Sequence, residues 1–180
     1  NALAAIALAD ELEIPISKTI DALKHFKGVG RRFETYKDLT FNDKTFTLVD
    51  DYGHHPVEIE AVLDATRDAY PGRSIYLVFQ PHRHTRTRDF FDEFVRVLHK
   101  ADQILLTDIY SAGETLIPGV SSPEMMEDIN KITTKVSFEK EINELAKTAL
   151  QNISQDSILI VMGAGSVSRV AKDILNIVNS

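Results

Sequence analysis

The sequence predicts an α/β fold, with a Rossmann-like, mainly parallel sheet flanked by helices on both faces and preceded by a short helical remnant. From about residue 30 onward, short apolar runs rich in β-branched residues alternate with amphipathic helical patterns. These runs are almost continuously apolar, which is typical of parallel strands that are buried on both faces. The first 27 residues instead repeat apolar side chains at helical spacing, and Gly28 and Gly30 separate them from the rest.

The first part of the chain is predicted to be a pair of helices. Residues 1–12 form the first helix, which Pro15 ends. Ser17 is the expected N-cap of the second helix, whose apolar stripe runs through Ile20, Leu23 and Phe26. Two short helices cannot bury their own apolar faces, so this pair must pack on the later domain or on a segment upstream. We therefore divide the chain into residues 1–29 and residues 30–180.

The second part is predicted to alternate between strands and helices. The turn-forming residues Asn42, Asp43 and Lys44 indicate a hairpin between an extended segment at 32–39 and a strand at 45–49. Further strands are predicted at 74–79, 103–107, 134–136 and 157–162. One helix is predicted to begin near Pro56, and others to cover residues 89–100, 123–132, 139–150 and 168–178.

Composition limits the classes of function. The chain has 180 residues, 43% of them hydrophobic and 26% charged, as in ordinary globular proteins. It has no cysteine, which excludes disulfides, thiolate metal sites and cysteine nucleophiles. A net charge of −7 argues against a nucleic-acid partner. Because there is no run of 18 apolar residues, we expect no membrane partner and a cytoplasmic location. The first methionine is Met125, so we expect a fragment of a longer protein.

Four polar loops follow four of the predicted strands, at residues 50–56, 80–88, 108–114 and 163–166. In a parallel sheet the carboxyl ends of the strands lie along one edge, and open α/β sheets bind their ligands there. Four of the six histidines fall in the first two of these loops. The sequence therefore predicts a ligand site at this edge, with four solvated turns as the alternative.

The first loop combines two carboxylates, a phenol and two imidazoles. These groups are Asp50, Asp51, Tyr52, His54 and His55. No packing requirement asks for so many polar groups in one turn, which favours ligand binding. Adjacent histidines on a turn point apart, and no other histidine pair or carboxylate has zinc-like spacing, so we expect no metal site made by protein side chains alone. A carboxylate close to nucleotide-bound magnesium remains open.

The second loop carries His82, Arg83 and Arg86 just ahead of the helix predicted at 89–100. Guanidinium groups bind carboxylate or phosphate through paired, charge-assisted hydrogen bonds, and a helix N-terminus adds to the attraction. We interpret the loop as an anion clamp. The alternatives are a solvated basic turn or a nucleic-acid contact, but the loop lacks interleaved aromatic residues.

The fourth loop contains Gly163 and Gly165 between a strand and a helix. It lacks both the dinucleotide fingerprint and a Walker lysine, so tight packing between strand and helix is the favoured role of these glycines. Ser166 with a histidine and an aspartate would suggest a hydrolase, but the Gly-x-Ser-x-Gly elbow is absent.

Together the loops resemble the C-terminal domain of the Mur ligase family, and among its members those that act on L-alanine. The motifs are Asp-Asp-Tyr-Gly-His-His-Pro at 50–56, Phe-Gln-Pro-His-Arg-His-Thr-Arg-Thr-Arg-Asp at 79–89, Asp-Ile-Tyr-Ser-Ala-Gly-Glu at 108–114 and Gly-Ala-Gly-Ser at 163–166. Residues 30–33 resemble the family's domain joint, and residues 1–5 the end of its ATP-binding central domain. One departure is His84, where the family pattern has tyrosine.

The resemblance implies a ligase that uses ATP and magnesium to activate the lactyl carboxylate of UDP-N-acetylmuramate as an acyl phosphate, which the amine of L-alanine then attacks. It implies that residues 50–55 line the nucleotide, with Asp51 near the ribose, and that Asn1 lies beside the adenine. His82, Arg83 and Arg86 correspond to the residues that hold the carboxylate of the amino acid or product. No catalytic residue is assigned.

The family's phosphate-binding loop, magnesium-binding carboxylate and sugar-nucleotide domain have no counterpart in this sequence, so we expect them in upstream domains and expect the chain alone to be inactive. Two other functions remain open at this point. One is a related ligase that attaches a recycled tripeptide to the same sugar nucleotide. The other is a stand-alone Rossmann-like module that binds a small ligand without chemistry.

Overall fold

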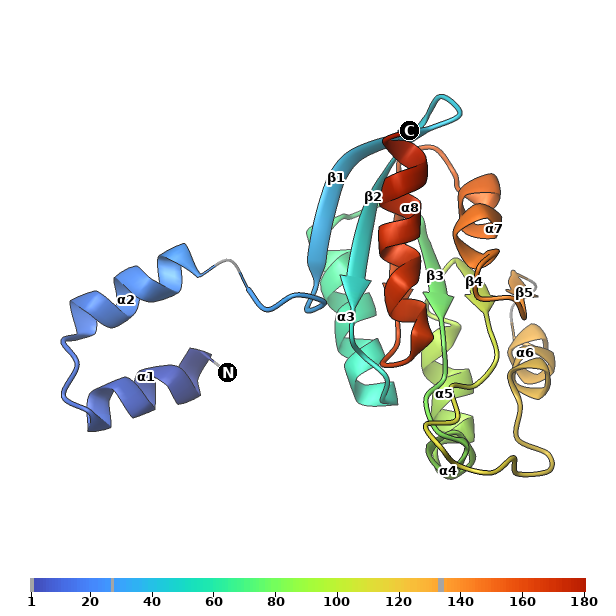
Figure 1. Ribbon diagram of the computed structural model, residues 1–180, viewed down its shortest axis with the longest axis horizontal. Helices are drawn as coiled ribbons and strands as arrows, with labels where there is room; N and C mark the ends of the chain where they lie inside the picture. Colours follow the sequence, from blue (N-terminus) through green and yellow to red (C-terminus); the bar gives the residue numbers. More distant parts are fainter. Residues whose placement is uncertain (1, 27, 133–134) are drawn as a thin grey trace. The chain divides into compact units, whose positions relative to one another are not determined.

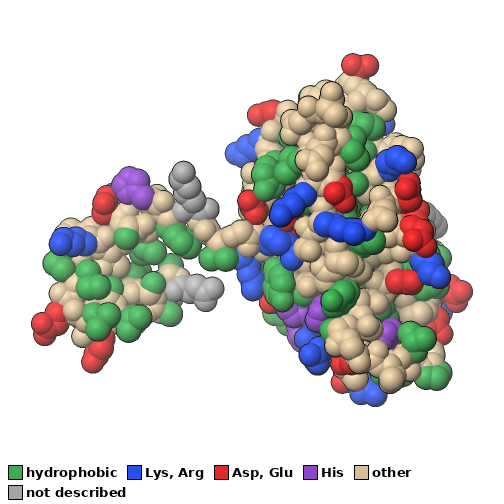
Figure 2. Space-filling model, in the orientation of Figure 1, with side chains coloured by type: hydrophobic (Ala, Val, Ile, Leu, Met, Phe, Trp, Pro, Cys, Tyr) green, Lys and Arg blue, Asp and Glu red, His purple; other side chains and the backbone are tan. Residues whose placement is uncertain are grey.

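The computed structural model describes residues 2–26, 28–132 and 135–180, and the chain forms two compact units, Asn1–Gly30 and Arg31–Ser180 (Figure 1). In the first unit, α1 (Ala2–Glu11) and α2 (Ile16–His25) pack against each other. Among residues 2–26 only Thr19 is buried. Large apolar side chains such as Leu3, Leu8 and Ile16 are exposed. Figure 2 shows hydrophobic side chains over much of the visible surface of this unit.

The N-cap prediction for the second helix is wrong. Helix α2 begins at Ile16 with Pro15 in the N-cap position, and Ser17 lies inside the first turn. Proline fixes its own φ near the helical value, and Pro15 O accepts from Lys18 N at 2.9 Å and from Thr19 N at 3.3 Å, so the first turn of the helix closes on Pro15. The observed φ of Pro15 is −52°.

The second unit is built on a six-stranded sheet with the order β1-β2-β6-β3-β4-β5. Its strands are β1 (Glu34–Phe41), β2 (Lys44–Asp51), β3 (Ile75–Phe79), β4 (Gln103–Leu106), β5 (Val136–Phe138) and β6 (Ser157–Met162). Only the β1–β2 hairpin is antiparallel among these pairs, so the predicted mainly parallel sheet is confirmed. The hairpin turns at Asn42 and Asp43, both with positive φ, as the sequence predicts.

Helices cover both faces of the sheet, which confirms the predicted layers (Figure 1). One face packs against α3 (Pro56–Ala69), α5 (Phe91–Leu98) and α6 (Ser122–Asn130). The other packs against α7 (Leu145–Asn152) and α8 (Val170–Val178). Alternate residues of β3 serve the two cores: Leu77 and Phe79 belong to the first, and Tyr76 and Val78 to the second. No described helix has the length and apolar character that a membrane span needs.

Three predicted helices have different limits in the structure. The helix predicted at 89–100 is observed as α5, and the preceding residues, predicted as a loop, form a separate short helix, α4 (His84–Asp89), which ends at Phe90 with its non-helical ψ of 28°. The helix predicted from residue 139 begins at Leu145, since Glu139 still donates its N–H to Leu106 O at the sheet edge. The last helix is preceded by a 3₁₀ turn, η1 (Ser166–Arg169). The short strand predicted at 134–136 lies at Val136–Phe138, and Thr134 is outside the described residues.

Candidate functional site

The four polar loops meet at the carboxyl ends of the parallel strands, as predicted. Gln80, directly after β3, connects three of them through its side-chain amide. Its Nε2 donates to Asp108 O at 3.2 Å and to Ser166 Oγ at 3.1 Å, and its Oε1 accepts from Val167 N at 2.9 Å. Gln80 is buried, so these hydrogen bonds hold the second, third and fourth loops together below the surface of this edge. Figure 2 shows histidine and basic side chains close together at this end of the unit.

The two carboxylates of the first loop are turned into the protein. Asp51 accepts a 2.7 Å hydrogen bond from Phe33 N on one oxygen and another of 2.7 Å from Gly53 N on the other. Asp50 Oδ1 accepts from Arg31 Nε at 3.2 Å. Burial raises the pKa of Asp50, although Arg31 opposes this shift. Both aspartates therefore hold the backbone of the loop in place through hydrogen bonds within the protein.

Arg31 connects the start of the second unit to the sheet edge. Besides Asp50, it donates from Nη2 to Gly163 O at 2.6 Å and to Asp51 O at 3.4 Å. Its guanidinium also lies 5.5 Å from the ring centre of Tyr52. Arg31 was not among the predicted site residues. Its backbone has a positive φ of 57°, which no sequence motif indicates.

Four aromatic rings form a continuous row across the first three loops. The aromatic row consists of Tyr52, His54, His82 and Tyr110, with successive ring centres 5.2, 5.7 and 5.4 Å apart. His82 and Tyr110 are nearly parallel, at 18°. Burial lowers the pKa of His82, and the neighbouring Arg86 lowers it further, so the ring is neutral at pH 7. The row thus presents aromatic rings with hydrogen-bonding groups at the edge of the sheet.

His55 has a different environment from His54, as the sequence predicts for adjacent histidines. Its ring contacts Phe90 with a centre-to-centre distance of 4.6 Å, and it caps α3 by accepting from Val57 N at 3.4 Å. Glu58 completes this cap, because its Oε2 accepts from His54 N at 3.0 Å and from His55 N at 3.2 Å. Glu58 was not among the predicted site residues. Its position three residues after the N-cap His55 is the sequence pattern that indicates this role.

The second loop is partly helical, so its arginines lie in a different backbone setting from the one predicted. Arg86 was predicted in a loop ahead of the helix at 89–100, and this placement is wrong, because Arg86 lies within the short helix α4. Its Nη1 donates to His82 O at 3.1 Å and lies 3.3 Å from His82 Nδ1. Arg83 immediately precedes α4 with a positive φ of 73°. His84, in contrast, is only 4% exposed and packs into the protein.

The glycines of the fourth loop are packed against the other loops. A Cβ on Gly165 would lie 2.5 Å from Gln80 Oε1 and 2.6 Å from Tyr110 Cβ. A Cβ on Gly163 would lie 2.8 Å from Val167 Cγ1. This geometry agrees with the packing role that the sequence favours for them. Beside these glycines, a hollow of about 360 Å³ is lined by residues of the second, third and fourth loops, among them Gln80, Tyr110 and Ser166.

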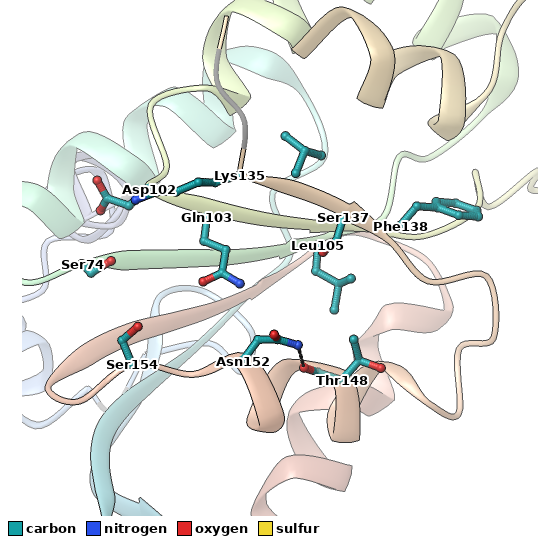
Figure 3. Close-up of a pocket in the computed structure, with 11 residues that line it drawn as sticks. Ser74, Asp102, Gln103, Leu105, Lys135, Ser137, Phe138, Thr148, Asn152 and Ser154 are labelled. Atoms are coloured by element: carbon teal, nitrogen blue, oxygen red, sulfur yellow. Dashed lines mark hydrogen bonds between the residues drawn. The ribbon is translucent and has the colours of Figure 1, made fainter. Parts of the chain in front are cut away.

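A second cavity lies far from these loops. It has a volume of about 380 Å³ and opens at the amino ends of β3, β4 and β5, beside α7 (Figure 3). Its charged residue Asp102 accepts from Ile75 N at 2.7 Å and pairs with Arg67, while Asn152 donates to Thr148 O. None of the residues predicted for the site lines it. We therefore place the chemistry at the carboxyl edge.

The residues described here do not fit a complete magnesium site. Over residues 2–26, 28–132 and 135–180, no three histidine, aspartate or glutamate side chains come together as metal ligands. Asp50 and Asp51 already accept hydrogen bonds from the protein. Asn1, predicted beside the adenine, lies outside the described residues.

Known proteins with the same sequence pattern and fold are ligases. The chain is 51% identical over 174 residues to UDP-N-acetylmuramate--L-alanine ligase of Methylobacillus flagellatus, covering 95% of this chain and 36% of that protein. The crystal structure of UDP-N-acetylmuramate-alanine ligase from Thermotoga maritima matches with a TM-score of 0.75 at 26% identity, covering 97% of this chain and 36% of that one. A murein peptide ligase from Psychrobacter arcticus shares the fold, with a TM-score of 0.69 at 19% identity, over 99% of this chain and 36% of that one.

The chain thus spans little more than a third of the length of these proteins. The family model described as Mur ligase, glutamate ligase domain, matches residues 31–165, which include the six strands described above, the first three loops and residues 163–165 of the fourth. The chain belongs to the Mur ligase family.

Proposed function

We propose that this chain is the C-terminal part of an ATP-dependent ligase that joins L-alanine to UDP-N-acetylmuramate in the cytoplasm, during synthesis of the peptidoglycan precursor. The observation that carries this proposal is the 51% identity over 174 residues to a protein of that name. The murein peptide ligase, at 19% identity, supports only the fold. We assign α1 and α2 to the end of the ATP-binding central domain, whose remainder would cover their exposed apolar side chains.

In this proposal Arg83 and Arg86 hold the carboxylate of L-alanine. The hydrogen bonds of Arg86 to His82 use only Nη1, so the described contacts leave the donors on Nη2 and Nε for a ligand. Arg83 has a half-exposed side chain, 51% accessible to solvent. Two planar guanidinium groups match a carboxylate through paired, charge-assisted hydrogen bonds. They would hold the amino acid so that its amine faces the activated lactyl carboxylate.

The first loop would line ATP. Tyr52 is 37% exposed and is flanked by the guanidinium groups of Arg31 and Arg32, which suits contact with a polar, planar ligand. Asp51 would approach the ribose through acceptor positions that its two internal hydrogen bonds leave, since each carboxylate oxygen accepts more than one bond. The rest of the loop surface that lines ATP would consist of Asp50, His54 and His55.

Magnesium, when bound with ATP, offsets the negative charge that develops on the phosphates. Its protein ligands would come from the upstream domains, because the described residues do not form a site for it. For the same reason we expect the 180-residue chain alone to show no ligase activity. The active site would be complete only when the domains close.

The test compares two arginines on the same short helix of the full-length ligase. Arg86→Ala removes one arm of the clamp, whereas Arg88→Ala removes an exposed guanidinium that pairs with Asp89. Losing one charge-assisted pair costs about 1.5–3 kcal/mol, so Arg86→Ala should lower kcat/KM for L-alanine roughly tenfold to a hundredfold. Arg88→Ala should change it little. Lysine keeps the charge but not the planar fork, so Arg86→Lys should recover only part of the loss.

The direction of the KM changes decides where the clamp acts. If Arg86 binds L-alanine, the KM for L-alanine rises and the KM for ATP stays the same. A raised KM for ATP with an unchanged KM for L-alanine would show instead that the clamp belongs to the phosphates.

A further inference from the structure

Glu114 connects the loop after β4 to the start of α4. Its Oε1 accepts from Thr85 Oγ1 at 2.7 Å, and its Oε2 accepts from Thr85 N at 3.0 Å. The same Oε1 lies 3.6 Å from Arg83 Nη1. One carboxylate therefore reaches both the first turn of α4 and one of the two arginines in the clamp. Nothing in the function proposed above uses it.

The beginning of α4 needs support from outside the helix. Arg83 occupies the N-cap position with a φ of 73°, a conformation that residues with a side chain rarely adopt, and among the described residues it provides no side-chain cap. The first N–H groups of a helix have no acceptor within the helix. Glu114 supplies one, as the carboxylate of a capping residue would, but from another loop.

Backbone hydrogen bonds also attach the third loop to the second, a few residues before this contact in both loops. Arg83 N donates to Tyr110 O at 2.8 Å, and Tyr110 N donates to Pro81 O at 2.9 Å. His82 stacks on the ring of Tyr110. After Tyr110 the chain turns back, with Gly113 at a φ of 86° and Glu114 N donating to Ser111 O at 3.0 Å. This turn places the Glu114 carboxylate next to Thr85 in the first turn of α4.

The distances from Glu114 show that its carboxylate is hydrogen-bonded to Thr85 but only lies near the guanidinium group of Arg83. The two hydrogen bonds to Thr85 are short, whereas the contact with Arg83 Nη1 is longer than a hydrogen bond. The carboxylate thus attracts the guanidinium without occupying its donors. The N–H of Thr85, followed by its hydroxyl, lowers the pKa of Glu114, so the charge is present throughout the neutral range.

We infer that Glu114 is a positioning residue for the amino-acid carboxylate: it fixes the first turn of α4 and orients the Arg83 guanidinium toward the ligand. This inference rests on the proposed function for the identity of the ligand. Glu114 does not touch the substrate and acts only through Arg83 and α4.

The kinetic test uses a double-mutant cycle in the full-length ligase, with Glu114→Gln, Arg83→Ala and the double variant. Glutamine keeps the shape and one acceptor oxygen but loses the charge, so Glu114→Gln should raise the KM for L-alanine roughly threefold to tenfold and leave the KM for ATP unchanged. Because Arg83→Ala removes the part of the effect that passes through Arg83, the same substitution in the Arg83→Ala background should raise the KM for L-alanine by a smaller factor than in the unsubstituted enzyme. Glu60→Gln is the matched control, since Glu60 also pairs with an arginine, Arg96, but on α3 and α5.

Nuclear magnetic resonance of the 180-residue chain separates this inference from the proposed function. Glu114→Gln should shift the Arg83 Nε–Hε signal and speed hydrogen exchange at the Thr85 amide, whereas Glu60→Gln should leave both unchanged. A full-length protein without L-alanine ligase activity would refute the proposed function, and these two signals would then decide alone whether Glu114 orients Arg83. Additive effects in the cycle, a raised KM for ATP, or unchanged signals in Glu114→Gln would overturn the inference.

Discussion

Removal of the Arg31 side chain should destabilise the second unit more than removal of its partner's charge. Arg31 pairs with Asp50 at 3.2 Å and donates to Gly163 O at 2.6 Å, so it joins the ends of β2 and β6. The Asp50 side chain is 8% exposed and that of Arg31 is 22% exposed. Arg31→Ala therefore leaves a buried carboxylate and a carbonyl oxygen without this donor.

The size of the effect follows from this burial. Breaking a buried ion pair by removing one partner costs about 3–5 kcal/mol, whereas surface pairs contribute about 0–1 kcal/mol. Because water reaches part of Arg31, we expect the free energy of unfolding to fall by about 2–4 kcal/mol at pH 7. For a unit of this size each kcal/mol lowers Tm by roughly 2–4 °C, so the expected decrease in Tm is roughly 5–15 °C.

Asp50→Asn is the informative comparison. The pKa of Asp50 is raised above its ordinary value of 3.8, mainly by burial, so its contribution to stability is fully present below pH 3.8 and is lost as the pH rises through the higher folded-state pKa. Asparagine has no charge to bury, and its carbonyl oxygen still accepts from Arg31. Asp50→Asn should therefore be close to the unsubstituted chain at pH 7, and it should lack this part of the pH dependence above pH 3.8.

Urea unfolding of the 180-residue chain between pH 4 and pH 8 measures these differences. Arg96→Ala serves as a control, because Arg96 forms an exposed pair with Glu60 and should cost less than about 1 kcal/mol. The reasoning fails if Arg31→Ala stays within about 0.5 kcal/mol of the unsubstituted chain, or if Asp50→Asn is equally destabilising.

The remaining predictions concern the loops and the joint. The pKa of His82 should lie below 6.5 in an NMR titration, so its stabilising contribution is present above pH 6.5 and is lost as the pH falls through the lower folded value; a pKa at or above 6.5 would contradict this. Gly165→Ala should destabilise by about 1–3 kcal/mol in the same urea assay, since its Cβ would lie 2.5 Å from Gln80 Oε1, and an unchanged midpoint would refute the packing role. Limited proteolysis should cut at residues 28–32 and leave a stable core, whereas a first cut at 74–106 would disprove the division of the chain.

The sequence predicts best where one periodic pattern determines the structure. The apolar run at 157–162 coincides with β6 because a strand buried on both faces is apolar at every position. The apolar stripe predicted for residues 89–100 begins at Phe90, and residues 84–89 before it have no apolar side chain. These residues nevertheless form α4, and the backbone leaves the helix at Phe90, whose ring contacts His55. This tertiary contact cannot be inferred from spacing along the chain.

The gathering of the four loops was predictable from the parallel order of the strands, but their connections were not. Arg31 and Gly163 are 132 positions apart, and Glu114 lies 29 positions from Thr85. Neither pair has a local motif, whereas the cap formed by His55 and Glu58 does. The resemblance to a family indicated Arg83 and Arg86 as site residues, and only the structure shows the contacts that hold them.

The charges at the edge are arranged differently from the net charge of the chain. Four carboxylates near the loops accept hydrogen bonds from the protein itself: Asp50, Asp51, Glu58 and Glu114. The side chains of Arg32 and Arg83, in contrast, are about half exposed. Buried or hydrogen-bonded carboxylates order the loops, and the guanidinium groups remain directed to solvent. The net charge of −7 therefore does not describe this edge, whose accessible cations suit a carboxylate or a phosphate.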